Sequence, residues 1–161
     1  MKVGIISDTH DRIDNLSKVI NILHNKGCEE LIHCGDLCSP FMISILEGFH
    51  GKVHCVLGNV GDPHVTLDRA MQAEINFEKD LLELEIERKK IAVIHYPKLA
   101  EALAYTKKYD IVFYGHNHMP YKEKIGYCWL VNPGELMGWK GKPCFAIYDT
   151  ETNNVEHFVL N

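Results

Sequence analysis

Short apolar runs alternate with helical patterns in the first third of the chain. The runs 2–7 (KVGIIS), 30–34 (ELIHC) and 52–57 (KVHCVL) are continuous and rich in β-branched residues, which predicts buried strands. Between the first two, an apolar stripe at positions i, i+3, i+4 and i+7 predicts a helix over 14–26. Ser39-Pro40 predicts the start of another helix, with Ser39 as its N-cap. This alternation predicts βαβ units and a parallel sheet.

The second half has a different pattern, in which strands dominate. Leucine and isoleucine alternate with glutamate over 82–87, which is typical of a strand with one wet face, and a hairpin turn over 87–90 leads into a strand over 91–95. A short helix is expected over 99–107. Further strands are expected near 111–114, 121–125, 128–131, 143–149 and 155–160. The predicted fold class is therefore α/β, with two sheets packed together and helices outside, in a single domain over 1–161.

Composition narrows the class of protein. The 161 residues are 46% hydrophobic and 24% charged, the balance of a globular domain, and the net charge of −5 argues against a nucleic-acid partner bound by a basic surface. The sequence contains no secretory signal pattern and no apolar stretch approaching a membrane span, so we expect a cytoplasmic protein without a membrane partner. The six cysteines form no C-x-x-C pair, which favours reduced packing residues over a zinc ribbon.

Polar clusters follow five of the predicted strands where each strand ends. In chain order they are Asp8-Thr9-His10, Gly35-Asp36, Gly58-Asn59, His95 and Gly115-His116-Asn117-His118. Ligands of open α/β sheets bind beyond the carboxyl ends of the strands. We therefore expect the five clusters to meet at one edge of the fold.

The side chains in these clusters form a mixed oxygen and nitrogen ligand set without thiolates. Such a set suits Mn²⁺, Fe²⁺, Ni²⁺, Co²⁺ or Zn²⁺ better than Ca²⁺ or Mg²⁺. Seven candidate ligands are too many for one tetrahedral zinc but fit two ions that share a bridging carboxylate. We expect the Asp-x-His and His-x-His pairs to present both side chains on one side of an extended segment.

Each cluster alone is compatible with turn chemistry or, for His95, with a buried core histidine. The complete ordered set resembles the calcineurin-like metallophosphoesterase superfamily, and most of all its small single-domain phosphodiesterase branch. The resemblance covers nearly the whole chain and implies a four-layer α/β/β/α sandwich.

The resemblance also implies the ligand set and its division between two ions. One ion would be held by Asp8, His10 and His118, and the other by Asn59, His95 and His116, with Asp36 bridging. We expect Mn²⁺ from ligand hardness, with Ni²⁺, Co²⁺, Fe²⁺ and Zn²⁺ as alternatives.

The reaction that this resemblance implies is hydrolysis of a P–O ester by a hydroxide between the two ions, with Asp36 and Asn59 as catalytic residues. Many members have histidine directly after Gly-Asn, where it stabilises the transition state or protonates the leaving group; here the position is Val60. His64 is a candidate catalytic substitute, and a surface-loop histidine is the alternative. Without that acid we expect better activity on diesters with good leaving groups than on alkyl monoesters.

Substrate-binding candidates lie beside the expected site. The segment Asn132-Pro133-Gly134 would form a loop there, through Asn132 and Gly134, although a plain turn is the alternative. Tyr96 follows His95 where the family often has glycine, so it would either line the substrate pocket or pack into the core.

Two other functions remain open at this stage. A non-catalytic protein-binding scaffold shares the fold, and nucleases occur in the same superfamily, although they usually carry a DNA-recognition region that this chain lacks. The preferred partner is a small phosphodiester substrate. The oligomeric state is open, with a homodimer through an exposed apolar patch compatible with the sequence.

Overall fold

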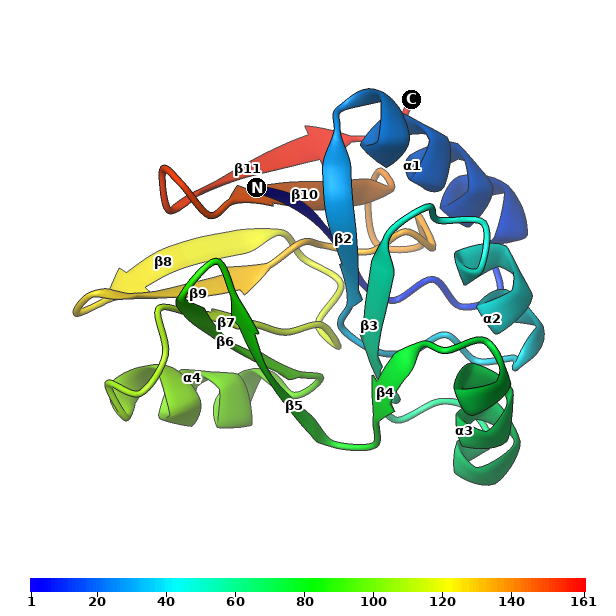
Figure 1. Cartoon of the computed structure of the whole chain (residues 1–161), viewed down its shortest axis with the longest axis horizontal. Helices are drawn as coiled ribbons and strands as arrows, with labels where there is room; N and C mark the ends of the chain where they lie inside the picture. Colours follow the sequence, from blue (N-terminus) through cyan, green and yellow to red (C-terminus); the bar gives the residue numbers. More distant parts are fainter.

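The computed structural model describes all 161 residues, which form two mixed sheets (Figure 1). The first sheet has the order β11-β10-β1-β2-β3-β4. Its strands are β1 (Lys2–Ile6), β2 (Cys28–His33), β3 (Lys52–Val56), β4 (Asn76–Glu78), β10 (Cys144–Asp149) and β11 (Asn154–Val159). The strands β1 to β4 run parallel through βαβ crossovers, and the first three of them were expected from the sequence.

The second sheet has the order β5-β6-β7-β9-β8. Its strands are β5 (Leu81–Ile86), β6 (Lys89–Ile94), β7 (Ile111–Phe113), β8 (Tyr121–Ile125) and β9 (Cys128–Asn132). The predicted hairpin joins β5 to β6, and the glutamates Glu83 and Glu85 face water as the alternation predicted. The strands β6, β7 and β9 are parallel, and the edge strands β5 and β8 are antiparallel to their neighbours.

Helices cover the outer face of each sheet and complete four layers. Helices α1 (Ile13–Asn25), α2 (Phe41–Leu46) and α3 (Pro63–Gln72) pack on the first sheet, and α4 (Pro97–Tyr105) packs on the second (Figure 1). Three buried clusters fill the spaces between layers, and the middle cluster joins the two sheets through residues such as Ile32, Val93 and Phe113. This α/β/β/α arrangement confirms the predicted fold class.

The helix boundaries follow from local sequence, with a difference from expectation at the start of α2. Helix α1 buries Leu16, Val19 and Leu23, as its stripe predicted. Helix α2 begins at Phe41, one residue later than predicted, although Pro40 before it already has helical dihedral angles. No helix of the structure is long and apolar enough to cross a bilayer.

The helix α3 and the strand β4 were not expected, because the sequence pattern predicted no element between the strand over 52–57 and the strand over 82–87. Asp62 caps α3, accepting hydrogen bonds from the backbone N–H groups of His64 and Val65, and Pro63 occupies the first turn. The helix buries only Thr66 and Ala70, so its apolar stripe is too weak to detect.

Candidate metal centre

The five polar clusters meet at one end of the sandwich. They follow β1, β2 and β3 of the first sheet and β6 and β7 of the second. Four short side-chain distances show that the clusters meet. His118 Nε2 lies 3.3 Å from Asp8 Oδ1, and His95 Nε2 lies 3.3 Å from Asp36 Oδ2. Asn59 Oδ1 lies 3.0 Å from His95 Nε2 and 2.8 Å from His116 Nδ1. We call Asp8, His10, Asp36, Asn59, His95, His116 and His118 the strand-end cluster.

One half of the cluster consists of Asp8, His10 and His118, whose ligand atoms lie close enough to hold a metal ion. His118 Nδ1 donates to Glu135 Oε2 at 2.6 Å, which leaves the Nε2 lone pair facing Asp8. His10 Nε2 is buried without any hydrogen-bond partner and lies 3.9 Å from Asp8 Oδ1. A buried, unpaired ring nitrogen among these groups fits a cation.

The other half consists of Asn59, His95 and His116. His95 Nδ1 donates to the carbonyl of Cys34 at 2.8 Å, so in the neutral ring Nε2 carries a lone pair. That lone pair faces the Asn59 carbonyl oxygen at 3.0 Å, and His116 Nδ1 approaches the same oxygen. Two acceptors pointed at each other are repulsive unless a proton or a cation lies between them.

Asp36 lies between the two halves. Its Oδ1 accepts hydrogen bonds from the backbone N–H groups of Asn59 at 2.8 Å and Val60 at 2.9 Å. Its Oδ2 lies 3.6 Å from His10 Nε2 and 3.3 Å from His95 Nε2. One oxygen is thus fixed by the backbone while the other faces both halves, and the nitrogen and oxygen donors present fit divalent ions.

Burial and mutual charge shift the titration of the carboxylates and His95. Burial raises the pKa of Asp8 above its usual value. For Asp36, burial acts in the same direction, but the hydrogen bond and charge of His95 and two backbone amides outweigh it and lower the pKa. Burial disfavours the imidazolium of His95, yet Asp36 reverses this and raises the pKa of His95. In the metal-free protein, the charges of Asp36 and His95 therefore shift each other's pKa.

The backbone at these ligands is left-handed and not extended as we expected. Asp8, His10 and Asp36 have φ angles of 52°, 40° and 60°, and His116 and His118 have φ angles of 73° and 63°. Aspartate and histidine adopt this region more readily than most residues, but each such residue still costs of order 1 kcal/mol or more. Tight turns, not pleated strands, therefore aim the two side chains of each pair.

Two glycines allow the loops to approach the ligands closely. A Cβ on Gly58, which has a φ of 87°, would collide with Asp36 Oδ1, and a Cβ on Gly115 would collide with Ser7 Oγ and with Asp8 Oδ2. Any side chain at either position would displace a carboxylate of the cluster. The glycines in these motifs therefore have a steric role at this site.

Asn132 and Gly134 lie beneath the cluster instead of lining it. Asn132 is fully buried, and its Nδ2 donates to the Gly115 carbonyl and to Asn117 Oδ1 while its Oδ1 accepts from the Gly134 N–H. These bonds support the loop that carries His116 and His118. Contact of Asn132 or Gly134 with a substrate stays a prediction.

The other candidates occupy different places. Tyr96 packs edge-on against the rings of His95 and His116, at centroid distances of 5.3 and 5.4 Å. His64 lies in the first turn of α3 and lines a small separate cavity with Leu57, and its side chain makes no hydrogen bond or ion pair with the strand-end cluster. Its catalytic role stays a prediction, because no contact in this structure supports it.

Two supporting residues escaped the sequence analysis. Glu135 is 1% exposed and forms a hydrogen bond with His118. Burial alone would raise the pKa of Glu135, but the hydrogen bond from His118 and those from backbone amides lower it. The side chain of Glu135 is therefore an ionised carboxylate. His33 accepts from the Gly35 N–H and contacts Thr9 Oγ1, and burial lowers the pKa of His33 to about 3. Only the position of Glu135 directly after Asn-Pro-Gly offered a signal.

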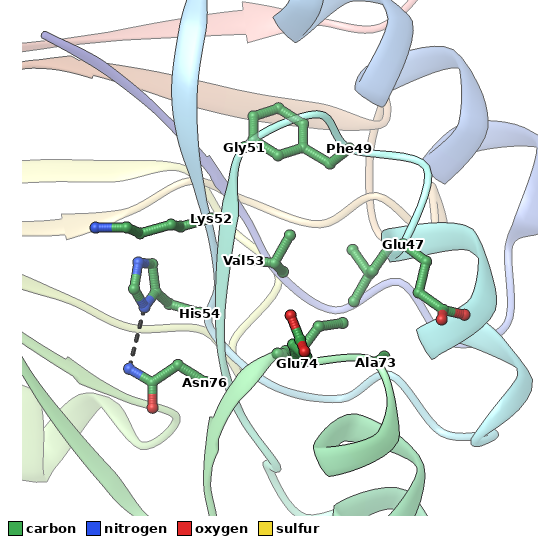
Figure 2. Close-up of a pocket in the computed structure, with 11 residues that line it drawn as sticks. Glu47, Phe49, Gly51, Lys52, Val53, His54, Ala73, Glu74 and Asn76 are labelled. Atoms are coloured by element: carbon green, nitrogen blue, oxygen red, sulfur yellow. Dashed lines mark hydrogen bonds between the residues drawn. The ribbon is translucent and has the colours of Figure 1, made fainter.

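The strand-end cluster opens into a cavity of about 360 Å³, within the range of small-molecule sites. A larger cavity lies between the end of α2, the start of β3 and the segment 73–76 that leads into β4 (Figure 2). There His54 bonds to Asn76 and Glu30, so both of its ring nitrogens already have partners. We therefore place the candidate chemistry in the smaller cavity.

Fold and site together define a metallophosphoesterase-type domain, and the chain belongs to the calcineurin-like phosphoesterase superfamily, whose domain profile matches residues 1–153. It is 33% identical to the phosphodiesterase MJ0936 of Methanocaldococcus jannaschii over 99% of both chains. A probable metallophosphoesterase of Methanothermobacter thermautotrophicus is 29% identical over 83% of this chain and 76% of its own. These similarities confirm the predicted family.

Solved structures give the same result for the fold. An archaeal phosphodiesterase superposes with a TM-score of 0.93 at 33% identity, over 99% of this chain and 100% of its own. Zinc-bound Vps29 of Entamoeba histolytica superposes with a TM-score of 0.72 at 17% identity over the full length of both chains. At that identity the second similarity shows a shared fold alone.

Proposed function

We propose that this protein is a phosphodiesterase that hydrolyses a small phosphodiester with two divalent ions held by the strand-end cluster. The observation that carries the proposal is the convergence of His95 Nε2, Asn59 Oδ1 and Asp36 Oδ2 beside the unpaired His10 Nε2. The similarity to an archaeal phosphodiesterase supports the type of substrate.

The two ions would occupy the two halves of the cluster, with Asp36 between them. We propose Mn²⁺, with Ni²⁺, Co²⁺, Fe²⁺ or Zn²⁺ as alternatives for this donor set. When bound, such ions supply a hydroxide nucleophile at neutral pH and offset the negative charge that develops on the phosphoryl group.

The residues of the chain position this chemistry. The backbone amides of Asn59 and Val60 hold Asp36 Oδ1, so only Oδ2 turns toward both halves. The Cys34 carbonyl and the Glu135 carboxylate select the ring tautomers of His95 and His118 that leave Nε2 free. Preorganised donors of this kind need little rearrangement when substrate arrives.

The cavity wall at Val60 has no proton donor for a leaving group. Val60 lines the cavity beside Asn59 and is 39% exposed. A leaving group on the Val60 side therefore gains no proton from that position, and this favours diesters with acidic leaving groups over alkyl monoesters.

The test is metal reconstitution of the chelated protein followed by parallel assays. Each ion is added to the wild type, to Asp36→Asn and to Asp68→Asn, an exposed aspartate on α3 that serves as the matched control. Bis-p-nitrophenyl phosphate and p-nitrophenyl phosphate are the substrates. We expect metal-dependent hydrolysis of the diester that exceeds that of the monoester, a loss of at least 100-fold in kcat for Asp36→Asn on the basis of general catalytic magnitudes, and no change for Asp68→Asn.

Different failures have different meanings. Stoichiometric metal binding without turnover of any diester would refute the enzyme and favour a protein-binding scaffold. Hydrolysis of DNA at rates that match or exceed those of the small diester would favour a nuclease instead.

A further inference from the structure

The cavity beside the strand-end cluster has a polar side and an apolar side. The apolar side is made by Val60, Met137 and Trp139. Trp139 is 70% exposed, and its ring centroid lies 6.0 Å from that of His118 in an edge-on arrangement. An indole of this exposure leaves a large apolar area in water beside a polar site, which is the composition of a ligand-binding pocket.

The loop that carries Trp139 is held in place at several points. The backbone N–H groups of Leu136 and Met137 donate to the carbonyls of Ser7 and Asp8, each at 3.0 Å. Further along, the N–H groups of Lys140 and Gly141 donate to Glu135 Oε1 at 2.5 and 3.0 Å. The loop is thus folded around a buried carboxylate, so the indole is presented on a prepared backbone.

Lys140 adds a positive charge to the same wall. Its Nζ lies 5.7 Å from the centroid of the Trp139 ring and donates to the Asn117 carbonyl at 3.4 Å. Lys140 lines the cavity together with His116 and His118. An anionic phosphoryl group at the cluster would therefore have a cation and an aromatic plane on one side.

We propose that Trp139 stacks on a planar aromatic ester group of the substrate, so that the preferred substrates are phosphodiesters with an aryl or nucleoside arm. This inference rests on the proposed function and deepens it by naming the substrate class. Every base and every aryl group offers a π-face, so stacking selects flat groups without selecting one sequence or ring. Lys140 attracts the negative charge of the phosphoryl group and does not distinguish an aryl ester group from a nucleoside ester group.

The experiment measures binding separately from turnover. The metal-loaded protein is titrated with phenyl phosphate, thymidine 5′-monophosphate and methyl phosphate, by calorimetry and by tryptophan fluorescence. Variants are Trp139→Ala, Trp139→Phe and Met71→Ala, the last a matched control that is 69% exposed on α3. Phenyl phosphate and thymidine 5′-monophosphate distinguish an aryl preference from a nucleoside preference.

We expect the wild type to bind at least one aromatic ester about tenfold more tightly than methyl phosphate, with quenched fluorescence, on the scale measured for stacking. Trp139→Ala should abolish this ratio while leaving methyl phosphate affinity unchanged, and Trp139→Phe should retain most of it. Met71→Ala should behave as the wild type.

An unchanged ratio in Trp139→Ala, or no aromatic preference in the wild type, would overturn the inference. Because these readouts need no turnover, an enzyme that hydrolyses bis-p-nitrophenyl phosphate without this preference would lose only the stacking proposal. A protein with the preference but no hydrolysis would lose only the proposed function.

Discussion

Replacing Glu135 with glutamine tests how His118 is prepared for a metal ion. In the wild type the Glu135 carboxylate accepts the Nδ1 proton of His118 at 2.6 Å. A glutamine can still accept the Lys140 and Gly141 amides through its carbonyl oxygen, but its NH₂ group would then face the Nδ1–H of His118. The conflict is relieved when His118 moves its proton to Nε2, which removes the lone pair that faces Asp8.

The expected cost follows from that proton. Loss of a supporting hydrogen bond of this type typically lowers metal affinity about 10- to 100-fold, or about 1.4–2.8 kcal/mol. The fold should survive, because the substitution preserves shape and the loop amides keep an acceptor. We expect Glu135→Gln to bind the ion at this half of the cluster correspondingly more weakly.

The assay is calorimetric titration of the chelated protein with Mn²⁺, together with thermal unfolding in the absence of metal. Glu151→Gln, an exposed glutamate in the β10–β11 turn, is the matched control. Wild-type Mn²⁺ affinity in Glu135→Gln, with metal-free unfolding unchanged, would refute the tautomer reasoning.

Three further predictions concern stability and reactivity. Leu31→Ala, at a fully buried position of β2, should lower the free energy of unfolding by about 2–5 kcal/mol in urea titrations, and a change below 1 kcal/mol would contradict the packing described. Val60→His should raise the ratio of monoester to diester kcat/KM, because it adds a proton donor at the cavity wall; an unchanged ratio would show that Val60 does not limit leaving groups. Since the pKa of His33 falls to about 3 on folding, the unfolded chain binds more protons between that pH and 6.5, and stability falls as pH is lowered through this window. From pH 6.5 to 5, chelated wild type should lose about 1.5 kcal/mol more than His33→Asn in denaturant titrations, and parallel curves would contradict this.

Periodicity predicted most of the fold because most elements bury a regular face. The alternation of Leu82 and Ile86 with glutamates is visible in sequence because one face of β5 is wet. Strand ends likewise predicted where Asp36 and His95 meet, since parallel strands bring their carboxyl ends to one edge. These features need only local pattern and one topological rule.

Features that depend on contacts between distant parts of the chain could not be predicted from the sequence pattern. Helix α3 buries two small side chains, so only the Asp62-Pro63 cap signalled it, and β4 is too short to show a period. The left-handed turn at Asp8 forms backbone hydrogen bonds with Gly35 and Met137, which are distant in sequence. Glu135 pairs with His118 across 17 positions of sequence, and no spacing rule links them.

The strand-end cluster draws ligands from both sheets, and this has a consequence for the molecule as a whole. Asp8, Asp36 and Asn59 belong to one layer, and His95 and His116 belong to the other. The side chains that fill the interlayer space, such as Phe113 and Tyr148, therefore act as a spacer that sets how far apart the two sets of ligands stand. A change of volume there would be transmitted as a change in the separation between the proposed ligands of the two sheets, so interior packing and the geometry of the strand-end cluster are under a common constraint.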